Sequence, residues 1–153
     1  MGHYSATVCW ELGDGDFRAN RYSRGHRWEF DGGIAVTASS SPQIVPLPHS
    51  LEEAVDPEEA FVASLSSCHM LFFLSLAAAD GIVVSRYRDE ASGILGKLPD
   101  GRLAITEVTL RPTADYLGDA PPVAELERLH HLAHEKCFIA NSVRTEIQVD
   151  LVS

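Results

Sequence analysis

Three cysteines, Cys9, Cys68 and Cys137, are the residues of this chain with the widest range of possible chemistry. An odd number of thiols cannot all pair within one chain. The first residues have neither a basic start nor an apolar run, so we see no secretion signal and expect a cytoplasmic protein. Cysteines in that reducing compartment are more often catalytic, metal-bound or inert than joined in disulfides. The question is therefore which of the three thiols reacts.

Cys68 lies in a long apolar segment, directly after Ser66 and Ser67. Serine hydroxyls compete for backbone groups, so this pair favours a helix cap over a helix interior. If the helix breaks there, Cys68 lies near a new helix N-terminus, which stabilises a thiolate. Alternatively, Cys68 packs as a small apolar residue. His69 is a poor base for Cys68, because neighbouring helix residues point about 100° apart.

Cys137 follows a histidine-rich segment that offers a second kind of chemistry. His130, His134 and Cys137 share one face of a predicted helix, and imidazole and thiolate ligands at this spacing could bind zinc. A metal-binding module is disfavoured because no fourth ligand is evident and no second cysteine lies nearby. A solvated helix face that happens to carry histidines is the simpler interpretation. Cys9 has no basic neighbour and is expected to be inert.

The charge balance limits the partners of the protein. Its 153 residues include 12 Lys+Arg and 22 Asp+Glu, a net charge of -10, which disfavours nucleic acid and anionic membranes. Residues 60–79 contain no Asp, Glu, Lys or Arg and are long enough to span a bilayer. Five polar side chains within them and the absence of flanking basic anchors argue instead for a helix enclosed by the protein.

Hydrophobic periodicity, caps and turns predict an α+β fold with mainly antiparallel sheet in one domain over residues 1–153. Hairpin turns and the lack of repeated βαβ units support this class. The predicted elements are strands near residues 4–11, 17–30, 34–38, 82–96, 103–112 and 143–151, and helices near 57–79 and 121–136. Of these, residues 4–11 and 143–151 alternate in polarity, which indicates half-buried strands.

Two motifs make the chain resemble the OsmC/Ohr family of osmotically inducible and organic hydroperoxide resistance proteins. Residues 56–68, DPEEAFVASLSSC, are similar to the family motif N-P-E-x-L/F-x-x-A-x-x-x-C. Residues 133–142, AHEKCFIANS, are similar to its second motif, A-H-x-x-C-P-x-S-N. The order of the elements also agrees over almost the whole chain. Two positions depart from the pattern: Asp56 replaces asparagine, and Phe138 replaces proline.

The resemblance implies an OsmC-like fold, in which sheets wrap around a central apolar helix that carries the first cysteine, and an intertwined homodimer with active sites at the subunit interface. It also implies an enzyme, a thiol peroxidase acting on organic hydroperoxides. Cys68 would be the peroxidatic residue and Cys137 the resolving residue. An external dithiol, such as a lipoylated protein, would reduce the enzyme again. The alternative within the same fold is a stress protein with slow, non-catalytic thiols.

The family also uses a glutamate and an arginine at the reactive thiol. Glu58 occupies the matching motif position, and Arg24 and Arg21 are the candidate arginines in the N-terminal segment. Glu58 precedes Cys68 by ten residues, which is about 15 Å along a straight helix. For Glu58 to act on Cys68, the helix must therefore break near residues 64–67, or an arginine must bridge the gap. Otherwise Glu58 is a first-turn acid that interacts with the helix dipole.

Overall fold

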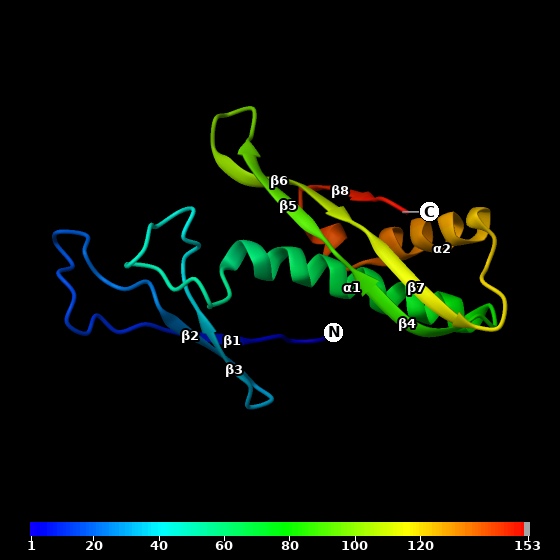
Figure 1. Ribbon diagram of the computed structural model, residues 1–153, viewed down its shortest axis with the longest axis horizontal. Coiled ribbons are helices and arrows are strands. Elements are labelled where there is room, and N and C mark those ends of the chain that lie inside the picture. The colour runs from blue at the N-terminus through cyan, green and yellow to red at the C-terminus, as the bar shows by residue number, and fades with distance from the viewer. Residues whose placement is uncertain (152–153) are drawn as a thin grey trace. The chain divides into compact units, whose positions relative to one another are not determined.

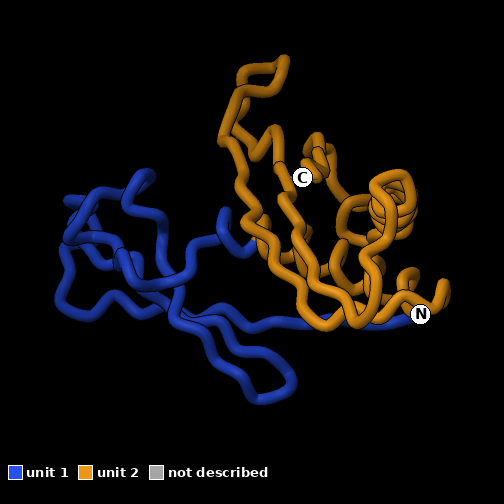
Figure 2. The backbone as a smooth tube through the Cα atoms, turned by 45° about the vertical axis from the view of Figure 1, so that its right-hand side comes forward, with its two compact units in different colours: residues 1–60 blue, residues 61–153 orange. Residues whose placement is uncertain are grey.

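The computed structural model describes residues 1–151 and has the predicted α+β class. The chain divides into two compact units, residues 1–60 and 61–153, which Figure 2 shows in different colours. Each unit is considered by itself below. One domain over residues 1–153 stays a prediction, and residues 152–153 lie outside the described part.

The first unit contains a three-stranded antiparallel sheet in the order β1-β2-β3. Its strands are β1 (Ala6–Cys9), β2 (His26–Phe30) and β3 (Ala35–Ala38). A strand lies within residues 4–11 as predicted, but its expected half-burial is wrong, because every residue of β1 is exposed in this chain. The predicted strand over residues 17–30 is also too long, since only its last five residues pair with neighbouring strands.

Helix α1 (Pro57–Ala79) begins and ends where the sequence predicts (Figure 1). The Asp56 carboxylate accepts a hydrogen bond from the Glu59 backbone N–H at 2.7 Å, and Glu59 accepts one from the Asp56 N–H at 3.3 Å. This reciprocal pair is a capping box. At the other end Gly81 has a φ of +73°, the left-handed conformation that lets the chain leave the helix at little steric cost.

The break near residues 64–67 that the serine pair made possible does not occur, because α1 is continuous for 23 residues. The serine hydroxyls find partners that leave the helix intact. Ser64 donates to the Phe61 carbonyl oxygen at 2.7 Å, and Ser66 donates to the Asp89 carboxylate at 2.5 Å. The second bond is long-range, so for Ser66 tertiary structure removes the competition between hydroxyl and backbone that could have broken the helix.

One stripe of α1 is buried in the second unit, and its four residues recur every fourth position. They are Leu65, His69, Phe73 and Ala77. Leu65 packs in a first apolar cluster and Phe73 in a second. By length and composition α1 could cross a membrane, yet such helices also occur in the cores of soluble proteins. The buried stripe and the Ser66–Asp89 bond attach one side of α1 to the second unit, but only 22% of its apolar window is buried, so the expectation of a helix enclosed by the protein is not met within the single chain.

Two further sheets complete the second unit. Strand β4 (Val83–Asp89) pairs antiparallel with β7 (Pro112–Leu117). The second sheet has the order β5-β6-β8 and consists of β5 (Ser92–Lys97), β6 (Leu103–Leu110) and β8 (Glu146–Val149). The β5–β6 pair is the expected hairpin, whereas β8 runs parallel to β6. The predicted alternation at the C-terminus is confirmed, because Ile147 and Val149 are partly buried between exposed residues.

The remaining helical segments carry the second cysteine region. Helix α2 (Val123–Lys136) directly follows Pro121 and Pro122 and lies within the predicted range. Its Leu129 and Ala133 pack with Phe73 in the second apolar cluster. A short 3-10 helix, η1 (Ala140–Ser142), follows and leads into β8. The second unit thus brings the C-terminal end of α2 to the cysteine-bearing part of α1.

Candidate active site

The second unit brings two thiols together that lie far apart in the sequence. Cys68 is a partly exposed residue of α1, and Cys137 is the residue at which α2 ends, only 1% exposed. The two thiols are close enough that Cys68 raises the pKa of Cys137 through hydrogen bonding and charge. All three cysteines are free. Cys9 is exposed on β1.

The surroundings of Cys137 keep it protonated. Burial is the largest cause that raises the pKa of Cys137, to about 11. The Ala140 backbone N–H lies 3.4 Å from Cys137 Sγ and acts in the opposite direction, because it stabilises the thiolate. Burial outweighs this bond, so Cys137 is a neutral thiol at physiological pH. A thiol in that state is a poor first nucleophile, because the thiolate is the reactive form.

Glu58 and Arg24 line one pocket of about 420 Å³ within the first unit. Tyr22 and His26 line it too, and Trp10 contributes an aromatic wall. One carboxylate oxygen of Glu58 is buried and has no hydrogen-bond partner among the described residues. A buried carboxylate oxygen without a partner is costly in a finished structure, and in a pocket wall it suits the binding of a donor.

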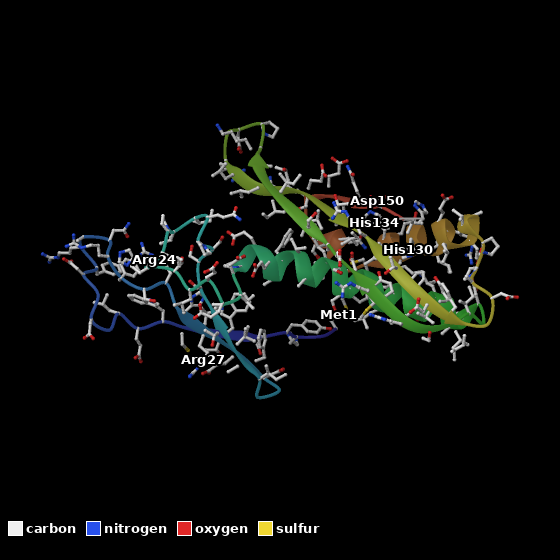
Figure 3. The ribbon with its side chains drawn as sticks, viewed as in Figure 1. Met1, Arg24, Arg27, His130, His134 and Asp150 are labelled. Atoms are coloured by element: carbon white, nitrogen blue, oxygen red, sulfur yellow. The ribbon has the colours of Figure 1, made fainter. Side chains whose placement is uncertain are left out.

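The Arg24 guanidinium is held in place by contacts with two residues, Tyr22 and Asn20. It lies over the Tyr22 ring, 3.6 Å from the ring centre, and donates to the Tyr22 carbonyl oxygen at 2.6 Å and to Asn20 Oδ1 at 2.7 Å. Arg24 is labelled in Figure 3. Arg21 does not line the pocket; it forms an exposed ion pair with Asp16 at 3.5 Å. Of the two candidate arginines, Arg24 is the one beside Glu58, and the catalytic roles of both stay predictions.

A buried pair of histidines lies in the second unit and was not predicted. His69 Nε2 and His130 Nδ1 are 2.9 Å apart, and the two rings are nearly parallel. His130 also stacks on Phe73, with ring centres 4.2 Å apart. Burial lowers the pKa of His69 and of His130 to about 4, so both are neutral at pH 7. The four-residue spacing of His69 from Leu65 and Phe73 was the available signal, because it places His69 in the apolar stripe.

The zinc-binding alternative does not agree with this geometry. His130 is bonded to His69, and Cys137 faces Cys68 rather than an imidazole pair. Within residues 1–151 no group of three or more His, Cys, Asp or Glu side chains is arranged to hold a metal ion. His130 and His134, labelled in Figure 3, instead line a pocket of about 270 Å³ beside α2. The geometry of the described residues therefore does not support the alternative of a metal module on His130, His134 and Cys137.

Comparison with known proteins connects this geometry to a family. Residues 50–152 match the family model described as OsmC-like protein. Among solved structures, an OsmC-like protein of unknown function from Vibrio cholerae is 53% identical, with a TM-score of 0.96 and coverage of 99% of this chain and 100% of that one. A comparison with curated proteins finds no match.

Two more distant structures share the fold. An organic hydroperoxide resistance protein OsmC from Legionella pneumophila is 18% identical, with a TM-score of 0.70 and coverage of 99% of this chain and 97% of that one. The organic hydroperoxide resistance protein OhrB of Bacillus subtilis is 20% identical, with a TM-score of 0.70 and coverage of 97% and 98%. The family match covers more than half of the sequence, and both cysteines lie within it. The chain therefore belongs to the OsmC-like protein family.

Proposed function

We propose that this protein is a thiol peroxidase that reduces organic hydroperoxides to alcohols. The observation that carries the proposal is the pair of adjacent free thiols, Cys68 and Cys137, with unequal burial. Support comes from family membership and from the names of two structural neighbours, which are organic hydroperoxide resistance proteins. The Vibrio cholerae relative has no known function, so the proposal rests on chemistry as much as on similarity.

The proposed reaction has two steps at sulfur. The Cys68 thiolate attacks the distal oxygen of ROOH, the O–O bond breaks, and the products are ROH, after protonation of the alkoxide, and Cys68 sulfenic acid. The Cys137 thiol then attacks the Cys68 sulfur, water leaves, and a disulfide closes. An external dithiol reopens this disulfide by exchange and is itself oxidised. The buried, protonated state of Cys137 suits the second role, since it keeps Cys137 from competing for peroxide.

We further propose that the protein is a homodimer, and that Glu58 and Arg24 bind the peroxide and the Cys68 thiolate. The apolar helix α1 supports a dimer: only 22% of its most apolar window is buried in the single chain, and Leu71 is 59% exposed. An uncovered apolar surface of this kind is typical of an interface, and a second copy would cover it. We also propose a cytoplasmic location, where the free thiols stay reduced.

Three matched cysteine variants test the function with tert-butyl and cumene hydroperoxide and a dithiol. We expect Cys9→Ser to keep full turnover and Cys68→Ser to lose it. Cys137→Ser should still consume one equivalent of peroxide and accumulate a sulfenic acid that dimedone traps. Peroxide turnover by Cys68→Ser, or failure of the unmodified protein to consume either peroxide, would contradict the proposal.

A further inference from the structure

Each cysteine of the pair is followed closely in the sequence by a phenylalanine, and the two phenylalanines contact each other. Phe72 lies four residues after Cys68, so both share one face of α1. Phe138 directly follows Cys137. The two rings meet edge to face, with centres 5.1 Å apart and planes at 87°. We call Phe72 and Phe138 the aromatic pair. This contact joins α1, which carries Cys68, to the segment after α2, which carries Cys137.

Phe138 is unusual because it is both exposed and fixed. It is 71% exposed, whereas the preceding Cys137 is 1% exposed. The backbone around it is held by hydrogen bonds: Ser142 Oγ donates to the Phe138 carbonyl oxygen at 2.7 Å, and the Asn141 N–H donates to the Cys137 carbonyl oxygen at 3.0 Å. Most of the Phe138 ring is therefore exposed to solvent, and the backbone around it is already held in place when a ligand binds.

An aromatic surface in this place distinguishes substrates by the group attached to the peroxide. Aromatic rings gain from edge-to-face or offset contact with another ring, beyond the apolar area that they cover. Hydrogen peroxide has no carbon group to make this contact, and a tert-butyl group makes only the area-dependent part of it. The family motif has proline at position 138, so the ring is a feature of this sequence rather than of the motif.

We propose that the aromatic pair determines substrate specificity, favouring hydroperoxides that carry an aryl group near the peroxide. This inference rests on the proposed peroxidase function and refines it. The aryl group leaves the reaction chemically unchanged, so its contact with Phe138 is equal in the ground state and the transition state. Such a contact lowers KM without raising kcat. Phe138 is thus a specificity residue and takes no part in bond breaking.

The first test compares kcat/KM for cumene and tert-butyl hydroperoxide. We expect Phe138→Ala to lower the cumene-to-tert-butyl ratio by about 3- to 10-fold, the range that one aromatic contact supplies, through KM and with kcat preserved. Phe138→Leu keeps apolar area and loses the ring, so it should lower the ratio as well. Leu117→Ala, which removes another exposed side chain at the end of β7, is the control and should leave the ratio unchanged.

The second test does not depend on peroxidase activity. In a Cys9→Ser background, Cys68 is alkylated with N-phenylmaleimide and with N-methylmaleimide, and the ratio of the two rates is compared before and after Phe138→Ala. We expect the phenyl preference to fall. Unchanged ratios in both tests overturn the inference. A protein that consumes no peroxide but shows the phenyl preference would contradict the proposed function and retain the aromatic site.

Discussion

The unequal reactivity of the two thiols can be measured most directly on Cys137. In a Cys68→Ser variant, the exposed Cys9 serves as an internal standard in the same molecule. A thiol with an ordinary pKa of about 8.5 is roughly one-tenth thiolate at pH 7.5. The pKa of Cys137 is raised to about 11, which leaves about one molecule in 3,000 as thiolate. We therefore expect Cys137 to react with iodoacetamide on the order of 300-fold more slowly than such an ordinary thiol.

The serine substitution itself changes this figure only slightly. Burial is the first cause of the raised pKa of Cys137, and the contributions of Cys68 are smaller. Removing Cys68 should therefore speed alkylation of Cys137 by a modest factor and leave it far slower than Cys9. Mass spectrometry of the two cysteine peptides over time gives both rates from one reaction.

The pH profile separates a raised pKa from simple shielding of the sulfur. If protonation limits the rate, alkylation of Cys137 rises about tenfold per pH unit and levels off only near pH 11. A shielded thiol of ordinary pKa would be slow at every pH and would level off near pH 9. The second profile would refute the assignment of Cys137 as a neutral, waiting thiol and would weaken the division of roles in the proposed reaction.

Three more predictions concern stability and assembly. Between about pH 6.5 and 4 the free energy of unfolding should fall as pH falls, because the unfolded chain binds protons that the buried, neutral His69 and His130 do not. At pH 5 the loss is about 2 kcal/mol for each histidine. In urea titrations at pH 5 and 8, His130→Asn should remove part of this difference, and the exposed His131→Asn should not. Leu65→Ala should destabilise the protein by about 2–4 kcal/mol, measured by urea unfolding, because it opens a cavity in the first apolar cluster. Leu71→Asp should shift the proposed dimer toward monomer in sedimentation, whereas a dimer of unchanged stability would place the interface elsewhere.

Local signals predicted the elements well where they acted alone. The predicted helix at residues 57–79 begins at the capping box of Asp56 and Glu59 and ends before Gly81, and both of these signals are local. Local reasoning failed where distant residues decided the outcome. Ser66 remains in a continuous helix because its hydroxyl binds Asp89, which is 23 positions away. The long strand expected before Phe30 was also wrong, since pairing there depends on partner strands that the polarity pattern does not identify.

The candidate site also depends on contacts between residues that lie far apart in the sequence. The adjacency of Cys68 and Cys137 followed from a resemblance and not from spacing, because no local rule brings such distant positions together. The choice between Arg24 and Arg21 needed coordinates, since both lie in one irregular, arginine-rich segment. Predicting the His69–His130 pair would have required knowing which face of α2 packs against α1. Sequence periodicity identifies the apolar face of each helix but not the element that it contacts.

The continuity of α1 restricts how Glu58 can take part in the proposed reaction. Ten residues of unbroken helix separate Glu58 from Cys68 and correspond to a rise of about 15 Å, well beyond the reach of a glutamate side chain. Since the helix does not break, Glu58 cannot act directly on the thiol of its own helix. Its proposed role therefore requires either an arginine that spans the distance or a thiol from a second copy. The uncovered apolar surface of α1 favours the second arrangement.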